Sequence, residues 1–356
     1  MQETESFRKW QFASDNTAPM CPEALDALNR ANGDWAPSYG DDSWTQQAKA
    51  QLVDFFERPL EVFFVFSGSA ANALVLSHYC RPYHSVLCHP FGHIETDEAC
   101  APEFFMGGGK LTLVEGKDGK LDPSRLGPVF LRGHGIHSAK PRVLSITQST
   151  EAGTVYSLEE LEVLGQVARE RELVFHMDGA RFFNALDSLQ CSPAAMTWKA
   201  GVDVLSLGAT KNGGPLCEAL VFFDPQGLEE MEWRRKMGGQ LASKHRYLSA
   251  PFGALLEDTV WRRNARHANA CARRLADGLT ALSGVELAFP VQSNAVFLRM
   301  PETRAQKLLD KGWHFYPFCD VDAWRFMCSW ITDTQAIDEL VNDATEIWRE
   351  LEGSAR

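Results

Sequence analysis

A lysine and an aspartate near the ends of two apolar segments are the residues of this chain best suited to chemistry. Lys211 follows the apolar segment 202–207, Asp178 follows the apolar segment 173–177, and a glycine comes soon after each. A lysine can hold pyridoxal phosphate as a Schiff base, and an acid can keep the cofactor's ring nitrogen protonated, so that the ring draws electrons from a substrate. We therefore interpret the pair as a cofactor site.

Both residues also have ordinary structural explanations. Most lysines lie on protein surfaces, and Asp178 could simply cap the helix that follows it. Arg181 lies three residues after Asp178, on the same helical face, where the two could form a structural ion pair. The small residues around Lys211 and the apolar segment before it favour the functional interpretation.

A third segment could bind an anion. Residues 67–72, Ser-Gly-Ser-Ala-Ala-Asn, open a helix after an apolar strand. Small residues let backbone N–H groups approach a phosphate, and a helix N-terminus favours negative charge. A plain strand-to-helix turn explains the segment equally well. Neither this segment nor the glycine-rich 107–110 has a dinucleotide or Walker A pattern.

Histidines crowd the segment 84–93. His89 and His93 have a spacing that suits zinc when it falls on a helix. Pro90 and Gly92 disfavour a helix there, and no third ligand is evident, so we expect no metal ion. We interpret one of these imidazoles as a ring stacked over a flat cofactor.

The elements that must position these residues follow an α/β pattern. Short apolar segments that alternate with helical ones, one of which opens with a capping box at 157–160, predict a mostly parallel central sheet with helices on both faces. Ligands of such sheets bind beyond the carboxyl ends of the strands. We predict strands at 62–66, 86–88, 110–114, 142–147, 173–177 and 202–207.

The pattern changes in the last third of the chain. Helical segments at 251–282 and 337–351 enclose strands at 294–299 and 324–329, which predicts a smaller α+β domain. A chain of 356 residues also exceeds what one simple core usually supports. We predict an N-terminal arm over 1–20, a large cofactor-binding domain over 21–250 and a small C-terminal domain over 251–356.

Composition excludes some classes of protein and favours a compartment. A net charge of −12 argues against nucleic acid or an anionic membrane as a partner. No apolar run approaches the ~20 residues that cross a bilayer, and the N-terminus does not resemble a signal peptide. Nine cysteines without a C-x-x-C pair indicate free thiols in a reducing cytoplasm.

With these residues in view, the chain resembles the threonine aldolases, in particular the bacterial low-specificity L-threonine aldolase and phenylserine aldolase branch. These are pyridoxal-phosphate enzymes of fold type I, like aspartate aminotransferase. Many matches in order are far more specific than any one motif. The matching segments are 12–16, 36–40, 67–73, 93–98, 101–105, 145–148, 176–181, 196–203, 208–213 and 263–269.

The resemblance implies roles around the cofactor. Lys211 would form the Schiff base, Asp178 would pair with the ring nitrogen, and His93 would stack on the ring. The other residues expected to contact the cofactor are Gly68, Ser69 and Lys244, all at its phosphate, and Arg181.

The resemblance also implies a substrate site. Ser14, Arg181 and Arg325 would bind the substrate carboxylate, and Tyr39 would reach in from a neighbouring subunit of a homodimer or homotetramer. Other branches of the family carry a second active-site histidine where this chain has the segment 149–151, Ser-Thr-Glu. The base for the reaction therefore stays open between His93, an ordered water and a phosphate oxygen acting through water.

The implied reaction is the reversible cleavage of an L-β-hydroxy-α-amino acid, such as threonine, allo-threonine or phenylserine, to glycine and an aldehyde. The nearest alternative is another reaction of the same cofactor, such as β-elimination, racemisation or decarboxylation. A nucleotide-binding or interaction protein on a similar sheet is the alternative from another class, because fold alone does not fix function.

Overall fold

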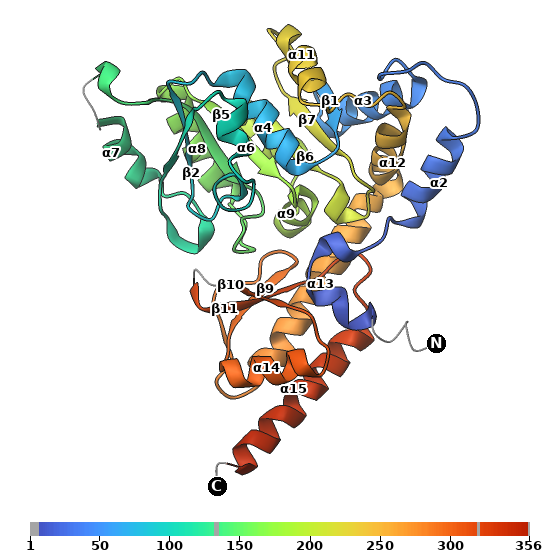
Figure 1. The fold of residues 1–356 in the computed structure, drawn as a ribbon, viewed down its shortest axis with the longest axis vertical. Coiled ribbons are helices and arrows are strands. Elements are labelled where there is room, and N and C mark those ends of the chain that lie inside the picture. Colours follow the sequence, from blue (N-terminus) through green and yellow to red (C-terminus); the bar gives the residue numbers. More distant parts are fainter. Residues whose placement is uncertain (1–6, 132–134, 319–320, 355–356) are drawn as a thin grey trace.

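The computed structural model describes residues 7–131, 135–318 and 321–354. Within these ranges the chain forms two lobes, a large one built on a seven-stranded sheet and a smaller one built on a four-stranded sheet (Figure 1). The long helix α13 (Val260–Thr280) runs from one lobe into the other. Cys319 and residues 1–6 of the predicted arm lie outside the described residues.

The large sheet has the strand order β1-β7-β6-β5-β4-β2-β3. The neighbours from β6 to β3 pair in parallel, whereas β7 runs antiparallel to both β1 and β6. The prediction of a mostly parallel central sheet is therefore confirmed. The strands are β1 (Glu61–Val65), β2 (His84–Cys88), β3 (Lys110–Leu113), β4 (Lys140–Thr147), β5 (Val174–Gly179), β6 (Val204–Gly208) and β7 (Glu218–Phe222).

Strand β7 is missing from the sequence prediction. It follows β6 after a connection that contains no α-helix, so the alternation of strands and helices that marks the other strands breaks here. Parallel strands need a long crossover, whereas a short connection returns the chain antiparallel. The segment 209–217, which carries Lys211, therefore links two strands that pair with each other.

Both faces of the large sheet are buried, as the apolar strands predict. On β1, Val62 and Phe64 enter one apolar core, while Phe63 and Val65 enter another on the opposite face. Successive side chains of a strand point to opposite faces, so helices must cover both. Helices α3 (Ser43–Phe56), α8 (Leu158–Glu170), α9 (Phe182–Leu189) and α12 (Arg246–Leu256) complete the first core, and α4 (Gly68–Tyr79) and α11 (Glu229–Met237) complete the second.

Shorter helices occupy the connections between the strands. The remaining α-helices of the large lobe are α2 (Pro22–Ala31), α5 (His93–Thr96), α6 (Ala101–Phe105), α7 (Leu126–Leu131) and α10 (Pro193–Met196). The predicted capping box is present at the start of α8, where the Ser157 side chain and Glu160 exchange hydrogen bonds with each other's backbone.

The small lobe has an antiparallel sheet of order β10-β11-β9-β8, with α13, α14 and α15 packed against it. Two of its strands, β9 and β11, match the prediction, whereas the short β8 and β10 were not foreseen. The last helix, which was predicted over 337–351, enters this core through Ile337, Leu340 and Ile347. The bounds are β8 (Glu286–Leu287), β9 (Ala295–Arg299), β10 (Tyr316–Phe318), β11 (Ala323–Met327), α14 (Glu302–Asp310) and α15 (Thr334–Ser354).

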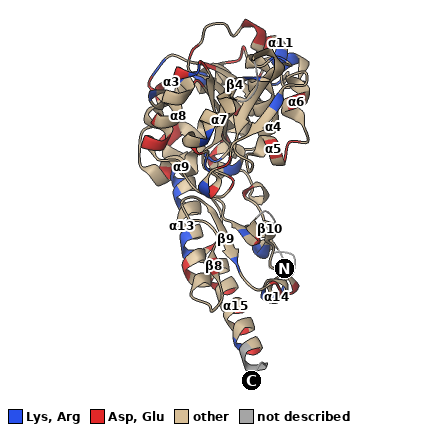
Figure 2. Ribbon diagram, turned by 90° about the vertical axis from the view of Figure 1, so that its left-hand side faces the viewer, with Lys and Arg blue, Asp and Glu red and all other residues tan. Residues whose placement is uncertain are grey.

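In the side view of Figure 2, acidic and basic residues are scattered over both lobes, and α13 and α15 form the elongated lower part of the molecule. The predicted boundary between residues 250 and 251 falls inside α12 and stays a prediction. None of the helices in the described ranges has the length and apolar character needed to cross a membrane.

Helix α8 packs unusually close to the turn that leads into β6. A Cβ atom at Gly165 would lie 1.9 Å from the carbonyl oxygen of Ala200, which is backbone and cannot move aside cheaply. Glycine is therefore required here by the approach of two chain segments, although it is a poor helix former. This contact fixes α8 against the sheet edge from which β6 begins.

We expect Gly165→Ala to lower the free energy of unfolding by ~1–3 kcal/mol or more. This is the usual cost of overpacking, and it should outweigh the better helix propensity of alanine. Urea unfolding followed by circular dichroism measures this change. Glu162→Ala, on the exposed face of the same helix, is the control and should change stability little. A Gly165→Ala protein as stable as the wild type would contradict the close packing.

Candidate active site

A cavity of about 350 Å³ lies beyond the carboxyl ends of the large sheet, where the N-terminal segment and the small lobe meet it. We call it the lysine cavity. This is the position at which open α/β sheets bind their ligands. Five of the residues selected from the sequence line it, namely Ser14, His93, Arg181, Lys211 and Arg325. The other lining residues are Asn16, Phe91, Thr96, Asp97, Glu151 and Phe318.

Lys211 reaches this cavity because β6 ends tightly against the loop after β5. A Cβ atom at Gly208 would lie 2.6 Å from the carbonyl oxygen of Ala180, so only glycine allows this approach. Behind the loop, Glu218 on β7 accepts a hydrogen bond from the backbone N–H of Ala209 at 2.8 Å. Burial raises the pKa of Glu218 to about 7. The end of β6 and the buried carboxyl group of Glu218 thus hold in place the loop that carries Lys211.

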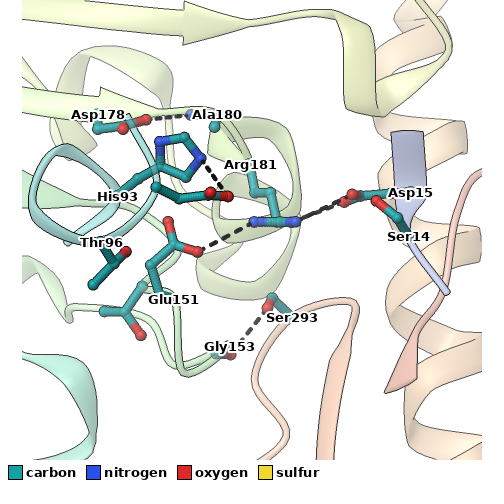
Figure 3. A network of polar contacts seen from close by, with 12 residues as sticks. Ser14, Asp15, His93, Thr96, Glu151, Gly153, Asp178, Ala180, Arg181 and Ser293 are labelled. Atoms are coloured by element: carbon teal, nitrogen blue, oxygen red, sulfur yellow. Dashed lines mark hydrogen bonds and ion pairs between the residues drawn. The ribbon is translucent and has the colours of Figure 1, made fainter. Parts of the chain in front are cut away.

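Asp178 lies at the end of β5 and begins a line of hydrogen bonds, of which Figure 3 shows the one from Ala180. Its Oδ1 accepts from the backbone N–H of Ala180 at 3.0 Å, and its Oδ2 accepts from Nδ2 of Asn72 at 2.8 Å. The same Nδ2 donates to Oε1 of Glu98 at 2.8 Å, and that oxygen lies 2.8 Å from Nδ1 of His93. One amide group therefore connects the two carboxylates, and the second carboxylate holds the imidazole.

The surroundings of Glu98 and His93 raise the pKa of both groups. Burial raises the pKa of Glu98, whose side chain is completely inaccessible to solvent. The hydrogen bond to Glu98 raises the pKa of His93, and this effect outweighs the burial of the imidazole. The other ring nitrogen, Nε2, lies 3.6 Å from Asp97, whose side chain is 84% exposed. The imidazole is therefore held in place chiefly from its buried side.

Arg181 is held by a buried carboxylate of the N-terminal segment. Its Nε and Nη2 donate to the two oxygens of Asp15 at 2.8 and 3.1 Å, and Asn294 of the small lobe also donates to Asp15 at 3.1 Å. Burial acts to raise the pKa of Asp15, but the charges of Arg181 and Lys211 outweigh it and hold that pKa below its usual value. One edge of the guanidinium is thus occupied, and Nη1 faces Glu151 at 3.9 Å.

Arg325, on β11, reaches the same cavity from the small lobe. Its buried Nε has no hydrogen-bond partner within the described residues. Burial, together with the positive charge of Arg181, lowers the pKa of Arg325. A partly desolvated guanidinium beside a second arginine is well suited to bind an anion. The negative charge would offset both the cost of burying the cation and the repulsion between the two arginines.

Gly68 and Ser69 form the first turn of α4 and do not line the lysine cavity. The Ser67 side chain caps this helix by accepting from the backbone N–H of Ala70 at 3.3 Å. A Cβ atom at Gly68 would meet no atom within 4 Å, so the space before the helix is open. The expected phosphate contacts stay predictions.

Lys244 and Tyr39 lie apart from the lysine cavity within this single chain. Lys244 is exposed and lines a different cavity with Trp35 and Ser243. Tyr39 is 48% exposed, and Nζ of Lys236 lies 5.0 Å from the centre of its ring. Their expected roles stay predictions.

The sequence analysis assigned no role to several residues that form these contacts: Asp15, Asn72, Glu98, Glu151 and Glu218. Asp15, Asn72 and Glu98 lie within segments that carry the family resemblance, so attention to every polar side chain there could have found them. Their partners could not be read from the chain, because 106 residues separate Asn72 from Asp178 and 166 separate Asp15 from Arg181.

The side chains present fit pyridoxal phosphate. An amine lines the lysine cavity, and a buried carboxylate lines the smaller adjoining cavity, which shares Phe91 and Glu151 with it. An imidazole and an open helix N-terminus complete the groups that this cofactor requires. In the part of the chain that the structure describes, no three histidine, cysteine or acidic side chains are arranged to hold a metal ion.

Comparisons with known proteins agree along most of the chain. Residues 11–303 match the family model described as β-eliminating lyase. Two low specificity L-threonine aldolases, from a Pseudomonas species and from Pseudomonas aeruginosa, are 49% and 48% identical over 333 residues, which covers 94% of this chain and 96% of each relative.

Solved structures give the same result. A threonine aldolase from Leishmania major superposes with a TM-score of 0.86 at 29% identity and covers 94% of this chain and 98% of its own. An aspartate aminotransferase from Thermus thermophilus, at 18% identity and a TM-score of 0.69, covers 97% of this chain and 94% of its own, and shares the fold. The expectation of fold type I is confirmed.

We expect Glu98→Gln to lower the pKa of His93, because the glutamine keeps the shape of the side chain but removes the charge that favours the imidazolium. Nuclear magnetic resonance of labelled histidine measures the titration, with His93→Gln to assign the signal. Asp97→Asn is the comparison and should shift the pKa less, because Asp97 is mostly exposed. An unchanged or higher pKa in Glu98→Gln would contradict the assigned contact.

We expect Glu218→Gln to change the pH dependence of stability. The folded pKa, about 7, lies above the ordinary glutamate value of 4.5. Protonation therefore stabilises the fold fully below the unfolded pKa, and this contribution is lost as the pH rises through the folded pKa. Because glutamine stays neutral, the variant should gain stability over the wild type from pH ~5 to pH ~8, by on the order of 3 kcal/mol.

Urea unfolding midpoints of the cofactor-free protein at the two pH values measure this gain. The matched control is Glu162→Gln, an exposed glutamate on α8 that should show no such trend. A difference between Glu218→Gln and wild type that stays the same at both pH values would rule out the raised pKa.

Proposed function

Because the chain belongs to the β-eliminating lyase family and, within it, to the low-specificity L-threonine aldolases, we propose that it cleaves an L-β-hydroxy-α-amino acid reversibly to glycine and an aldehyde. Pyridoxal phosphate is its cofactor, and an amino acid is its small-molecule substrate. The observation that carries the proposal is the lysine cavity, which combines one amine, one imidazole and two guanidinium groups on its wall.

Lys211 would hold the cofactor covalently through Nζ, and Asp178 would pair with its ring nitrogen. When bound, the cofactor withdraws electrons from the α carbon of the substrate. Asn72 and Ala180 each donate to Asp178, which supports a fixed orientation of that carboxylate. His93 would stack on the ring, and its hydrogen bond to Glu98 supports a fixed imidazole.

Arg325, Arg181 and Ser14 would bind the substrate carboxylate. Arg325 offers a buried Nε without a partner among the described residues, and Arg181 offers the edge that Asp15 leaves free. Planar guanidinium groups suit a carboxylate because they bind its two oxygens together. Their role would be to orient the bond between the α and β carbons, which is positioning rather than bond-making.

The remaining predicted contacts would complete the site in an oligomer. Gly68 and Ser69 would bind the phosphate at the N-terminus of α4. Lys244 would help to bind the phosphate, and Tyr39 would reach in from a second copy of the chain in a homodimer or homotetramer. Within one chain, both residues line other cavities. We also propose a cytoplasmic location, since the eight described cysteines are free.

We expect the wild-type enzyme to convert threonine, allo-threonine or phenylserine to glycine plus an aldehyde, and Lys211→Ala to lose this activity. General acid–base assistance is typically worth ~10²–10⁴-fold, so the loss should exceed that of His93→Ala. Lys199→Ala removes a lysine paired with Glu57 outside the cavity and serves as the control.

Product analysis of the same reactions separates the alternatives. Release of ammonia and a keto acid from serine would indicate β-elimination, and loss of optical purity without cleavage would indicate racemisation. Near-normal cleavage by Lys211→Ala would exclude Lys211 as the residue that holds the cofactor.

A further inference from the structure

One acidic side chain on the wall of the lysine cavity has no role in the binding scheme above. Glu151 follows β4, in the segment where the sequence lacks the second histidine of other branches, and its side chain is 16% exposed. It lines both the cavity that holds Lys211 and the adjoining one that holds Asp178. In Figure 3 it lies below His93, and a dashed line joins it to Arg181. The carboxylate therefore stands where substrate and cofactor must meet.

The loop that carries Glu151 is fixed by hydrogen bonds on both sides. Thr150 donates its backbone N–H to the carbonyl of Thr154 at 2.9 Å, and their hydroxyl groups lie 2.7 Å apart. The hydroxyl of Ser293 in the small lobe donates to the carbonyl of Gly153 at 2.9 Å (Figure 3). A reactive group must be held by its surroundings to act efficiently, and this loop meets that condition.

The carboxylate of Glu151 faces one cation, and its oxygens accept no hydrogen bond from the described residues. Its nearest cation is Nη1 of Arg181, at 3.9 Å, which is longer than a hydrogen bond. Arg181 is already bound through its other edge to Asp15. Within the described residues, no hydrogen bond reaches the oxygens of Glu151, so its lone pairs stay available to a substrate hydroxyl.

The other proton acceptors on the cavity wall are less suitable. His93 is bound through Nδ1 to Glu98, and that hydrogen bond raises the pKa of His93, so the imidazole tends to keep its proton. Asp97 also lines the cavity, but its side chain is 84% exposed. The hydroxyl of Thr96 already donates to the carbonyl of Gly92.

We propose that Glu151 is the catalytic residue that takes the proton from the β-hydroxyl group of the substrate. As the carboxylate accepts this proton, the electron pair of the O–H bond becomes the second bond of the aldehyde carbonyl. The bond between the α and β carbons breaks, and its electron pair stays with the α carbon. Glu151 then gives its proton to water, and the α carbon gains one proton from Lys211 or water. The sum is one aldehyde and one glycine.

The assignment rests on the proposed aldol cleavage, and one comparison separates the two. Cleavage requires removal of the hydroxyl proton, whereas exchange of the α hydrogen of glycine with deuterated water involves no hydroxyl group. We expect Glu151→Gln to lower kcat for phenylserine cleavage by ~10²–10⁴-fold, the range for general base catalysis. Glycine exchange and the binding of pyridoxal phosphate, titrated by absorbance, should stay as in the wild type.

Two further variants serve as a control and as a comparison. Glu162→Gln, an exposed glutamate on α8, should leave both reactions unchanged. Asp97→Asn tests the other carboxylate of the cavity wall, and its effect on cleavage should be much smaller than that of Glu151→Gln.

Three results would overturn the assignment. Glu151→Gln could cleave phenylserine at a near-normal rate, or Asp97→Asn could be the variant that loses cleavage. Cleavage and glycine exchange could also fall together in Glu151→Gln, which would show that Glu151 acts by positioning Arg181. A wild-type enzyme that exchanges glycine but releases no aldehyde would instead overturn the proposed function itself, and the assignment with it.

Discussion

A buried ion pair between Arg181 and Asp15 joins the three parts of the chain that enclose the lysine cavity. Asp15 comes from the N-terminal segment, Arg181 follows β5 of the large sheet, and Asn294 of the small lobe donates to the same carboxylate. Removing one member of such a pair leaves an uncompensated buried charge, which is strongly unfavourable. The ion pair therefore fixes how the lobes meet, and with it the distance between the arginines proposed to bind substrate and the lysine proposed to bind cofactor.

A second constraint acts on charge rather than on shape. Asp178 and Glu98 are two buried carboxylates that would repel each other, and the amide of Asn72 donates to both. Their surroundings differ, because Glu98 also meets the imidazole of His93, and Asp178 meets a backbone N–H at the end of β5. When two neighbouring titratable groups have different surroundings, they can take different chemical roles. Here one carboxylate holds the imidazole, and the other lines the smaller cavity that adjoins the lysine cavity.

The sequence predicted the parts of this arrangement that depend on local pattern. Apolar segments located the parallel strands, and their ends located Asp178 and Lys211, because the carboxyl ends of parallel strands share one edge of a sheet. Strand β7 was not predicted, because its connection to β6 lacks an α-helix. Two sets of side-chain contacts were also not predicted: the ion pair of Arg181 with Asp15, and the hydrogen bonds that run from Asp178 to His93. Both depend on side chains that only the folded chain brings together. The resemblance supplied candidate roles for Ser14 and Arg325, which no local pattern suggests.

If the proposed site is correct, pyridoxal phosphate is bound covalently to the lysine on the loop between β6 and β7. Borohydride reduction of the yellow enzyme, followed by proteolysis and mass spectrometry of the labelled peptide, tests it most directly. We expect a single modified peptide that contains Lys211, with the cofactor on its side-chain amine. A cofactor fixed to any other lysine, or a protein that takes up none, would contradict it.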